Sequence, residues 1–229
     1  YIYLATYLLA ASIQIINFTI LIFIKIKKPG VTAKKIRPLK DILIQKTLII
    51  AILAAAVGYS LMSFIMTATP LQIVNICKLG NSASSTVIQW HIIAMFAPSF
   101  FTGSIISRFG NKKVMLVGTI LYAFSVFFGI LGDTVLNFWI ALFLCGLGWN
   151  FLYVGGSDII AKSALPEERA KVQGVTDFII FVFVSMGSFL AGYLHSNLGW
   201  EIMLFYTIIP ILLIFIGIII IKPQNLKLN

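Results

Sequence analysis

The sequence predicts an all-α membrane protein, a polytopic bundle of seven transmembrane helices. Seven apolar stretches fill most of the chain, at 1–24, 47–69, 86–107, 114–131, 137–161, 172–194 and 201–221. A hydrocarbon core ~30 Å thick needs about 20 apolar residues in a helix, and a helix satisfies its own backbone hydrogen bonds there. Because the stretches lack the alternating pattern of barrel strands, each is expected to be helical.

Composition points to the same class. The chain is 60% hydrophobic and only 10% charged, with a mean hydropathy of +1.02. A soluble domain carries about 25% charged residues. A water-soluble core is therefore not expected.

The positive charge falls on one side of the seven stretches. If successive loops alternate sides, loops 25–46, 108–113 and 162–171 share one face with the tail 222–229. That face holds 16 of the 17 lysines and arginines, and only Lys78 lies opposite. Short cytoplasmic loops retain lysine and arginine, so this face and the C-terminus are expected in the cytoplasm of a cell (inner or plasma) membrane. This topology explains the net charge of +10, and no nucleic-acid partner is expected.

No residue pattern predicts an enzyme, a metal or a cofactor. Cys77 lies in an outer loop and Cys145 inside a helix, so a disulfide is not expected. The sequence has no Cys/His metal spacing and no glycine-rich nucleotide loop after a strand. Gly155-Gly156-Ser157 lies inside an apolar stretch, and the serines and histidines have no triad partner at one depth.

The chain divides into a first helix at 1–24, a basic linker at 25–46, a six-helix bundle at 47–222 and a tail at 223–229. Pro29 and Gly30 end the first helix. The connection 70–85 is expected to be a loop, because it opens with Pro70 and contains the turn signal Gly80-Asn81-Ser82. Six helices match one half of a transporter built from two six-helix halves.

The most specific segment is 103–113, which joins two apolar stretches through a short basic turn. Arg108 follows a helix C-terminus, where a cation is favoured, and Gly110 permits a positive φ in the turn. The spacing resembles the signature loop of the major facilitator superfamily, roughly G-x-x-x-D-R-x-G-R-K-K. The matching positions are Gly103, Arg108, Gly110, Lys112 and Lys113. Ser107 replaces the usual aspartate and Asn111 the first basic residue of the run.

Two further stretches, 166–174 and 146–150, are similar to segments of the same superfamily. The resemblance covers 47–221 and implies the C-terminal half of a twelve-helix transporter. It makes 1–24 the last helix of the N-terminal half and 25–46 the central cytoplasmic linker. The chain lacks an initiator methionine, so the rest of the N-terminal half is expected upstream, as a missing partner.

Two helices carry polar and aromatic side chains on one face. In 47–69 these are Tyr59, Ser63 and Thr67, and in 137–161 they are Asn150 and Tyr153, with Trp149 beside them. The resemblance implies that both helices line a central cavity, which makes these six residues candidates for contact with substrate. The alternative is helix packing, which small and polar residues also favour.

Two ionisable residues are gate or coupling candidates. Asp177 lies about five residues inside 172–194, where a carboxylate needs a partner or water; it could close an inner gate against the other half or simply reach the interface. His91 lies near the outer end of 86–107 and could carry a coupling proton, or act only as an interfacial histidine. Asp158 and Lys162 have the spacing of a helical ion pair.

These features predict a secondary active transporter that moves a small molecule across the bilayer by alternating access. Energy would come from an ion gradient, such as a proton gradient, or from the gradient of the substrate, for efflux or uptake. The alternatives are a seven-helix receptor or scaffold without transport activity, and an integral-membrane enzyme, for which we find no catalytic group.

Overall fold

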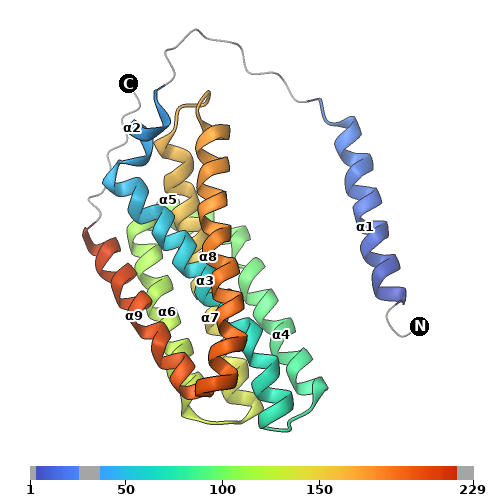
Figure 1. Ribbon diagram of the computed structural model, residues 1–229. Helices are drawn as coiled ribbons and strands as arrows, with labels where there is room; N and C mark the ends of the chain where they lie inside the picture. The colour runs from blue at the N-terminus through green and yellow to red at the C-terminus, as the bar shows by residue number, and fades with distance from the viewer. Residues whose placement is uncertain (1–3, 26–36, 221–229) are drawn as a thin grey trace. The chain divides into compact units, whose positions relative to one another are not determined.

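The computed structural model describes residues 4–25 and 37–220 and is helical throughout its long elements (Figure 1). The chain forms two compact units, 1–35 and 36–229. The first contains the helix α1 (Leu4–Phe23). The second contains α2 (Leu39–Leu43), α3 (Lys46–Pro70), η1 (Leu71–Ile76), α4 (Asn81–Phe96), α5 (Ser99–Phe109), α6 (Asn111–Leu131), α7 (Val135–Ser163), α8 (Arg169–Leu198) and α9 (Trp200–Ile220).

The predicted fold class is confirmed. Six helices in the described residues are long and apolar enough to cross a membrane, and the number is seven if α4 and α5 form one bent span. The two helices meet at an angle of 43° around Pro98, which lacks the N–H that a continuous helix needs. This is therefore an all-α polytopic membrane bundle.

The predicted loop at 70–85 is much shorter in the structure. Pro70 adopts helical backbone angles, and the helix continues beyond it as the π-helical segment η1. The wider π turn accommodates a position where the normal hydrogen-bond ladder is interrupted by proline. Only 77–80 connects η1 to α4, and Gly80 makes the turn with a φ of +88°. The predicted linker 25–46 also contains a short helix, α2.

Helices α3 and α7 lie in the middle of the second unit and pack against each other. Helix α8 packs along α3, and α4 packs along α7, so these four helices form one side of the unit in the order α8, α3, α7, α4. Helices α6 and α9 pack together behind them, as Figure 1 shows on the left. We call the α8–α3–α7–α4 side the central face.

Glycines allow the middle helices to approach closely. A Cβ added to Gly156 of α7 would lie 2.8 Å from the carbonyl oxygen of Ala51 on α3. Between α6 and α7, Gly118 and Gly148 face each other in the same way. Packing of small residues is a main source of helix association in lipid, so these contacts fix the scaffold under the central face.

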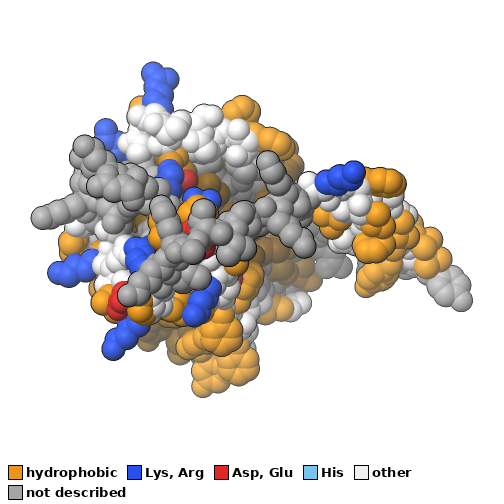
Figure 2. All heavy atoms as spheres, turned by 90° about the horizontal axis from the view of Figure 1, so that it is seen from above, with side chains coloured by type: hydrophobic (Ala, Val, Ile, Leu, Met, Phe, Trp, Pro, Cys, Tyr) orange, Lys and Arg blue, Asp and Glu red, His pale blue; other side chains and the backbone are white. Residues whose placement is uncertain are grey.

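Nine of the ten lysines and arginines in 37–220 lie at one end of the bundle. This basic end carries α2, the α5–α6 turn and the α7–α8 connection, and Lys78 lies at the opposite end. Figure 2, a view onto the basic end, shows these side chains around its rim. The segregation expected from the sequence is therefore present, while its cytoplasmic orientation stays a prediction.

Candidate functional site

Aromatic side chains from four helices meet on the central face. Tyr59 of α3 lies 5.3 Å, between ring centroids, from both Trp149 and Tyr153 of α7, and 5.9 Å from Phe181 of α8. Trp149 and Tyr153 are stacked at 5.1 Å with an interplanar angle of 8°. Phe96 of α4 reaches Trp149 at 5.8 Å. These five residues form what we call the aromatic cluster.

The cluster has a buried floor and an open rim. Trp149 is 5% exposed, whereas Phe96 and Phe181 are 56% and 51% exposed, and Tyr59 and Tyr153 are half-buried. The indole Nε1 of Trp149 has no hydrogen-bond partner among the described residues. A rim of ring edges and faces over a fixed indole suits a planar aromatic ligand, because aromatic pairs favour stacked or edge-to-face contacts.

The sequence therefore selected three residues that the fold brings together: Tyr59, Trp149 and Tyr153. It missed Phe96 and Phe181, because apolar side chains in a membrane helix carry no distinguishing signal. Of the other two candidates on α3, Ser63 is hydrogen-bonded to Ser188 of α8 at 2.7 Å, and Thr67 is exposed. Both lie outside the aromatic cluster.

Asn150 lies beside Trp149 but points into a separate, fully buried network. Its amide nitrogen donates to the carbonyl oxygen of Met95 at 2.7 Å and lies 2.6 Å from the hydroxyl of Ser99. The hydroxyl of Thr102 donates to its amide oxygen at 2.6 Å. These contacts surround Pro98, so Asn150 satisfies backbone freed by the α4–α5 bend, as neighbouring helices do at prolines in membranes.

His91 is buried between α4 and α7 and is not at the interface with water. Its Nδ1 lies 2.7 Å from the carbonyl oxygen of Leu142, which can only accept, so Nδ1 carries the proton. Its Nε2 has no partner among the described residues. Gly146 makes this contact possible, since an added Cβ would lie 2.7 Å from the His91 carbonyl oxygen. The geometry favours packing, and a coupling role stays a prediction.

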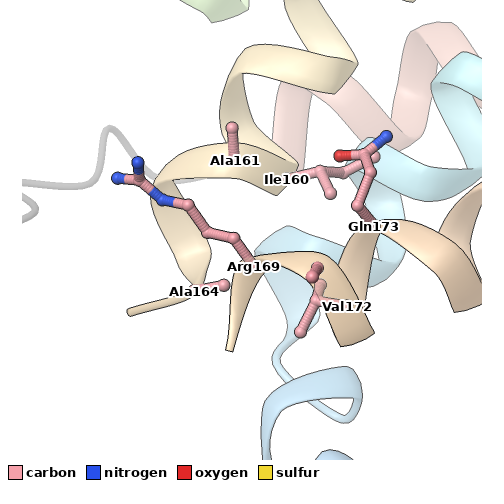
Figure 3. Close-up of a pocket in the computed structure, with 7 residues that line it drawn as sticks. Ile160, Ala161, Ala164, Arg169, Val172 and Gln173 are labelled. Atoms are coloured by element: carbon pink, nitrogen blue, oxygen red, sulfur yellow. The ribbon is translucent and has the colours of Figure 1, made fainter. Parts of the chain in front are cut away.

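Asp177 is half-buried on α8, one turn before Phe181 of the aromatic cluster. The amide of Gln173, one turn earlier, donates to its Oδ1 at 2.7 Å. Gln173 in turn lines a pocket of about 280 Å³ at the α7–α8 junction (Figure 3).

The turn predicted at 103–113 has the expected shape but an unexpected anchor. Gly110 has a φ of +84°, as predicted. Asn111, which replaces a basic residue of the signature, donates to the carbonyl oxygen of Gly155 at 2.9 Å and to Asp158 at 2.8 Å. Asp158 also pairs with Lys162, at the predicted helical spacing. The turn is thus fixed to α7 by an amide.

The other signature residues lie around this turn. Arg108 is exposed, with its guanidinium 5.3 Å from the ring centroid of Phe109. Lys112 donates to the carbonyl oxygen of Ile219 near the end of α9. Lys113 and Gly103 are exposed, and nothing lies within 4 Å of a Cβ added to Gly103.

A second polar contact at the basic end was missed from the sequence. Arg37, just before α2, forms an ion pair with Glu168 at 2.6 Å and also donates to the carbonyl oxygen of Ser163. The Glu168 side chain is 2% exposed and also accepts from the backbone N–H groups of Arg37 and Leu165. Hydrogen bonds from the Arg37 side chain lower the pKa of the Glu168 carboxyl to about 2. Arg37 and Glu168 are far apart in the sequence and belong to no recognisable motif, so the sequence did not predict this ion pair.

Comparison with known proteins matches residues 48–227 to the family model of the Major Facilitator Superfamily. This chain belongs to that superfamily. The superfamily consists of multi-pass membrane transporters, and the assignment of 103–113 as its signature loop stays a prediction.

Individual members of the superfamily are also similar to this chain. A riboflavin transporter, RfnT, of Brucella anthropi is 39% identical over 202 residues, which cover 87% of this chain and 50% of that protein. The uncharacterized transporter YdeG of Bacillus subtilis is 33% identical over 152 residues, 65% of this chain and 35% of that protein. Multidrug resistance protein MdtL of a Shewanella species is 23% identical over 158 residues, 66% and 40% of the two chains. The chain thus spans half or less of the length of these relatives.

Proposed function

We propose that this chain supplies the C-terminal half of a secondary active transporter that moves a planar aromatic small molecule, with riboflavin as the first candidate. The observation that carries the substrate class is the aromatic cluster, in which the rings of Trp149, Tyr153 and Tyr59 are in continuous contact across two helices. The similarity to a riboflavin transporter supports the choice, because the isoalloxazine of riboflavin is a flat fused ring.

In this proposal the central face meets a second six-helix bundle, and the substrate is bound between the two. Alternating access then arises from rocking of one bundle against the other around the bound ring. Ser63, Thr67 and Asn150 contribute as neighbours of the cluster and as supports of its helices. The gradient that drives transport acts through ionisable groups, of which Asp177 and His91 are the proposed candidates in this half.

A second candidate is efflux of varied lipophilic compounds, which the similarity to a multidrug resistance protein favours. The exposed rings of Phe96 and Phe181 suit such ligands, since apolar surfaces bind without requiring fixed hydrogen bonds. The two functions differ in selectivity. A flavin transporter discriminates against unrelated lipophilic dyes, whereas a multidrug transporter moves them.

The test uses the full-length transporter in proteoliposomes, with uptake of riboflavin measured by its fluorescence. Stacking of one base on an aromatic side chain is worth ~1–3 kcal/mol. Trp149→Ala removes the ring on which Tyr153 is stacked, and is therefore expected to lower the affinity for riboflavin by about tenfold or more. Tyr153→Phe, which keeps the ring, is expected to bind nearly normally, and Tyr153→Ala to bind weakly.

The matched control is Trp139→Ala, a tryptophan on the same helix that stacks on Phe143 outside the cluster. Equal loss in Trp139→Ala and Trp149→Ala would contradict a role for the cluster. Uptake of lipophilic dyes without uptake of riboflavin would favour the efflux function. Absence of any flux would favour a receptor or scaffold.

A further inference from the structure

We propose that Asp177 and Gln173 form a polar subsite beside the aromatic cluster, which binds the hydroxyl groups of an uncharged, polyhydroxylated side chain on the aromatic substrate. This inference rests on the proposed function and deepens it. It assigns the ring of the substrate to the aromatic cluster and its sugar-alcohol chain to the α7–α8 side of the central face.

The first support is that Asp177 has acceptor capacity to spare. It lies two to three turns inside a spanning helix, where an ionised carboxylate requires polar partners. Its Oδ1 accepts from Gln173, and no residue in 37–220 donates to its Oδ2. The ion pairs in the same range join Arg37 to Glu168 and Lys162 to Asp158, so no described cation neutralises Asp177.

The second support is the place of Asp177 relative to the rings. Asp177 lies four residues before Phe181 on α8, so the two residues share one face of the helix, one turn apart. Phe181 contacts Tyr59 in the cluster at 5.9 Å between ring centroids. A flat ligand held against the cluster at Phe181 therefore has the carboxylate within reach of a substituent on its edge.

The third support is space. The pocket in Figure 3 opens where α7 ends and α8 begins. Its lining consists of Ile160, Ala161, Ala164, Arg169, Ala170, Val172 and Gln173. Gln173 thus contributes both to this pocket and to the contact with Asp177, so the polar subsite borders open volume at the α7–α8 junction.

The charge of the subsite defines the chemistry of the ligand. A carboxylate is an acceptor only, and the amide of Gln173 offers both a donor and an acceptor. Hydroxyl groups complement this pair, because each can donate to the carboxylate. The subsite is therefore suited to the hydroxylated side chain of riboflavin.

The experiment compares two flavins, one with the hydroxylated chain and one without it. Riboflavin and lumiflavin, in which a methyl group replaces the chain, are titrated against the purified full-length transporter and its Asp177→Asn variant, with binding followed by quenching of flavin fluorescence. Hydrogen bonds to a charged group are the stronger kind, so Asp177→Asn is expected to weaken riboflavin binding about tenfold and to leave lumiflavin binding unchanged.

Two control variants separate substrate binding by Asp177 from a role in gating or coupling. Glu201→Gln makes the same chemical change at the opposite end of the bundle and is expected to alter neither affinity. Asp177→Glu is expected to restore part of the preference for riboflavin. Equal weakening of both flavins, or a shifted pH profile of transport with unchanged affinities, would overturn the subsite and assign Asp177 to gating or coupling. If the wild type binds neither flavin, the proposed function itself fails.

Discussion

At the scale of single residues, Asn150 shows how one polar side chain can secure a bend in a membrane helix. Pro98 interrupts the ladder between α4 and α5, and the carbonyl oxygen of Met95 then accepts from Asn150 on another helix. Lipid offers no substitute donor. The position of this asparagine next to Trp149 also couples the bend to the floor of the aromatic cluster.

Asn150→Leu is expected to destabilise the protein, because it leaves the Met95 carbonyl and the Thr102 hydroxyl without their present partner. Interhelical hydrogen bonds in membranes contribute about 0.6 kcal/mol on average, with a maximum near 1.7, and a buried group left unsatisfied costs ~1–3 kcal/mol. We expect the free energy of unfolding of the detergent-solubilised transporter, measured by reversible unfolding, to fall by about 1–2 kcal/mol. Asn197→Ala, at an exposed position, is the control, and equal losses would contradict the assigned role.

At the scale of elements, α2 is attached to the bundle by both packing and charge. Ile42 is 1% exposed, and Arg37 at the start of this segment is held by Glu168 at the beginning of α8. The end of the predicted linker, at 37–43, is therefore part of the folded unit.

The contact between Arg37 and Glu168 is expected to contribute stability in a defined pH range. The folded pKa of Glu168 is about 2, below the ordinary value of 4.5, mainly because its carboxylate accepts hydrogen bonds from Arg37. A lowered folded pKa means that the contribution is complete above pH 4.5 and is lost as the pH falls from there toward 2. The free energies of unfolding of the wild type and of Glu168→Gln should therefore differ by a constant amount near neutral pH.

The difference between the two proteins should shrink as the pH falls below about 4.5. Glu201→Gln, which removes an exposed carboxylate at the opposite end, provides the comparison for general acid effects. A difference that persists unchanged to pH 2 would show that the glutamate does not act through its charge.

At the scale of the whole molecule, 36–229 is a helical bundle with one basic end. Its central face brings rings from four helices together, and its basic end carries nearly all of the lysines and arginines in 37–220. In the proposed function, the central face works against a second six-helix bundle.

The orientation of the bundle can be tested by labelling. In a full-length protein without its natural cysteines, Lys40→Cys and Arg108→Cys are expected to react with an impermeant maleimide from the cytoplasmic side, and Lys78→Cys from the other side. The reason is that lysine and arginine are retained in short cytoplasmic loops. All three positions are exposed. Labelling of Lys40→Cys and Arg108→Cys from opposite sides would contradict the topology.

The element boundaries show where sequence patterns stop being sufficient. Pro70 and Gly80 predicted a long loop, yet the helix runs on through η1 because proline's φ is compatible with a helix and the wider turn absorbs the missing hydrogen bond. Asn111 seemed only a departure from the signature, but a contact with Asp158 on α7 gives it a function. The second outcome depends on a neighbour that is distant in the chain, which a sequence pattern does not reveal.

The sequence by itself determined the membrane class, the approximate helix spans, the charged end and the superfamily. These follow from the length of the apolar runs, the distribution of lysine and arginine and a glycine–arginine turn, all of which are local properties of the chain. The sequence also selected Tyr59, Trp149 and Tyr153. Only the tertiary structure decided that these three join Phe96 and Phe181, and that Asn150 supports a bend. Such relations depend on the rotation and close packing of helices, which are set by contacts among residues far apart in the chain.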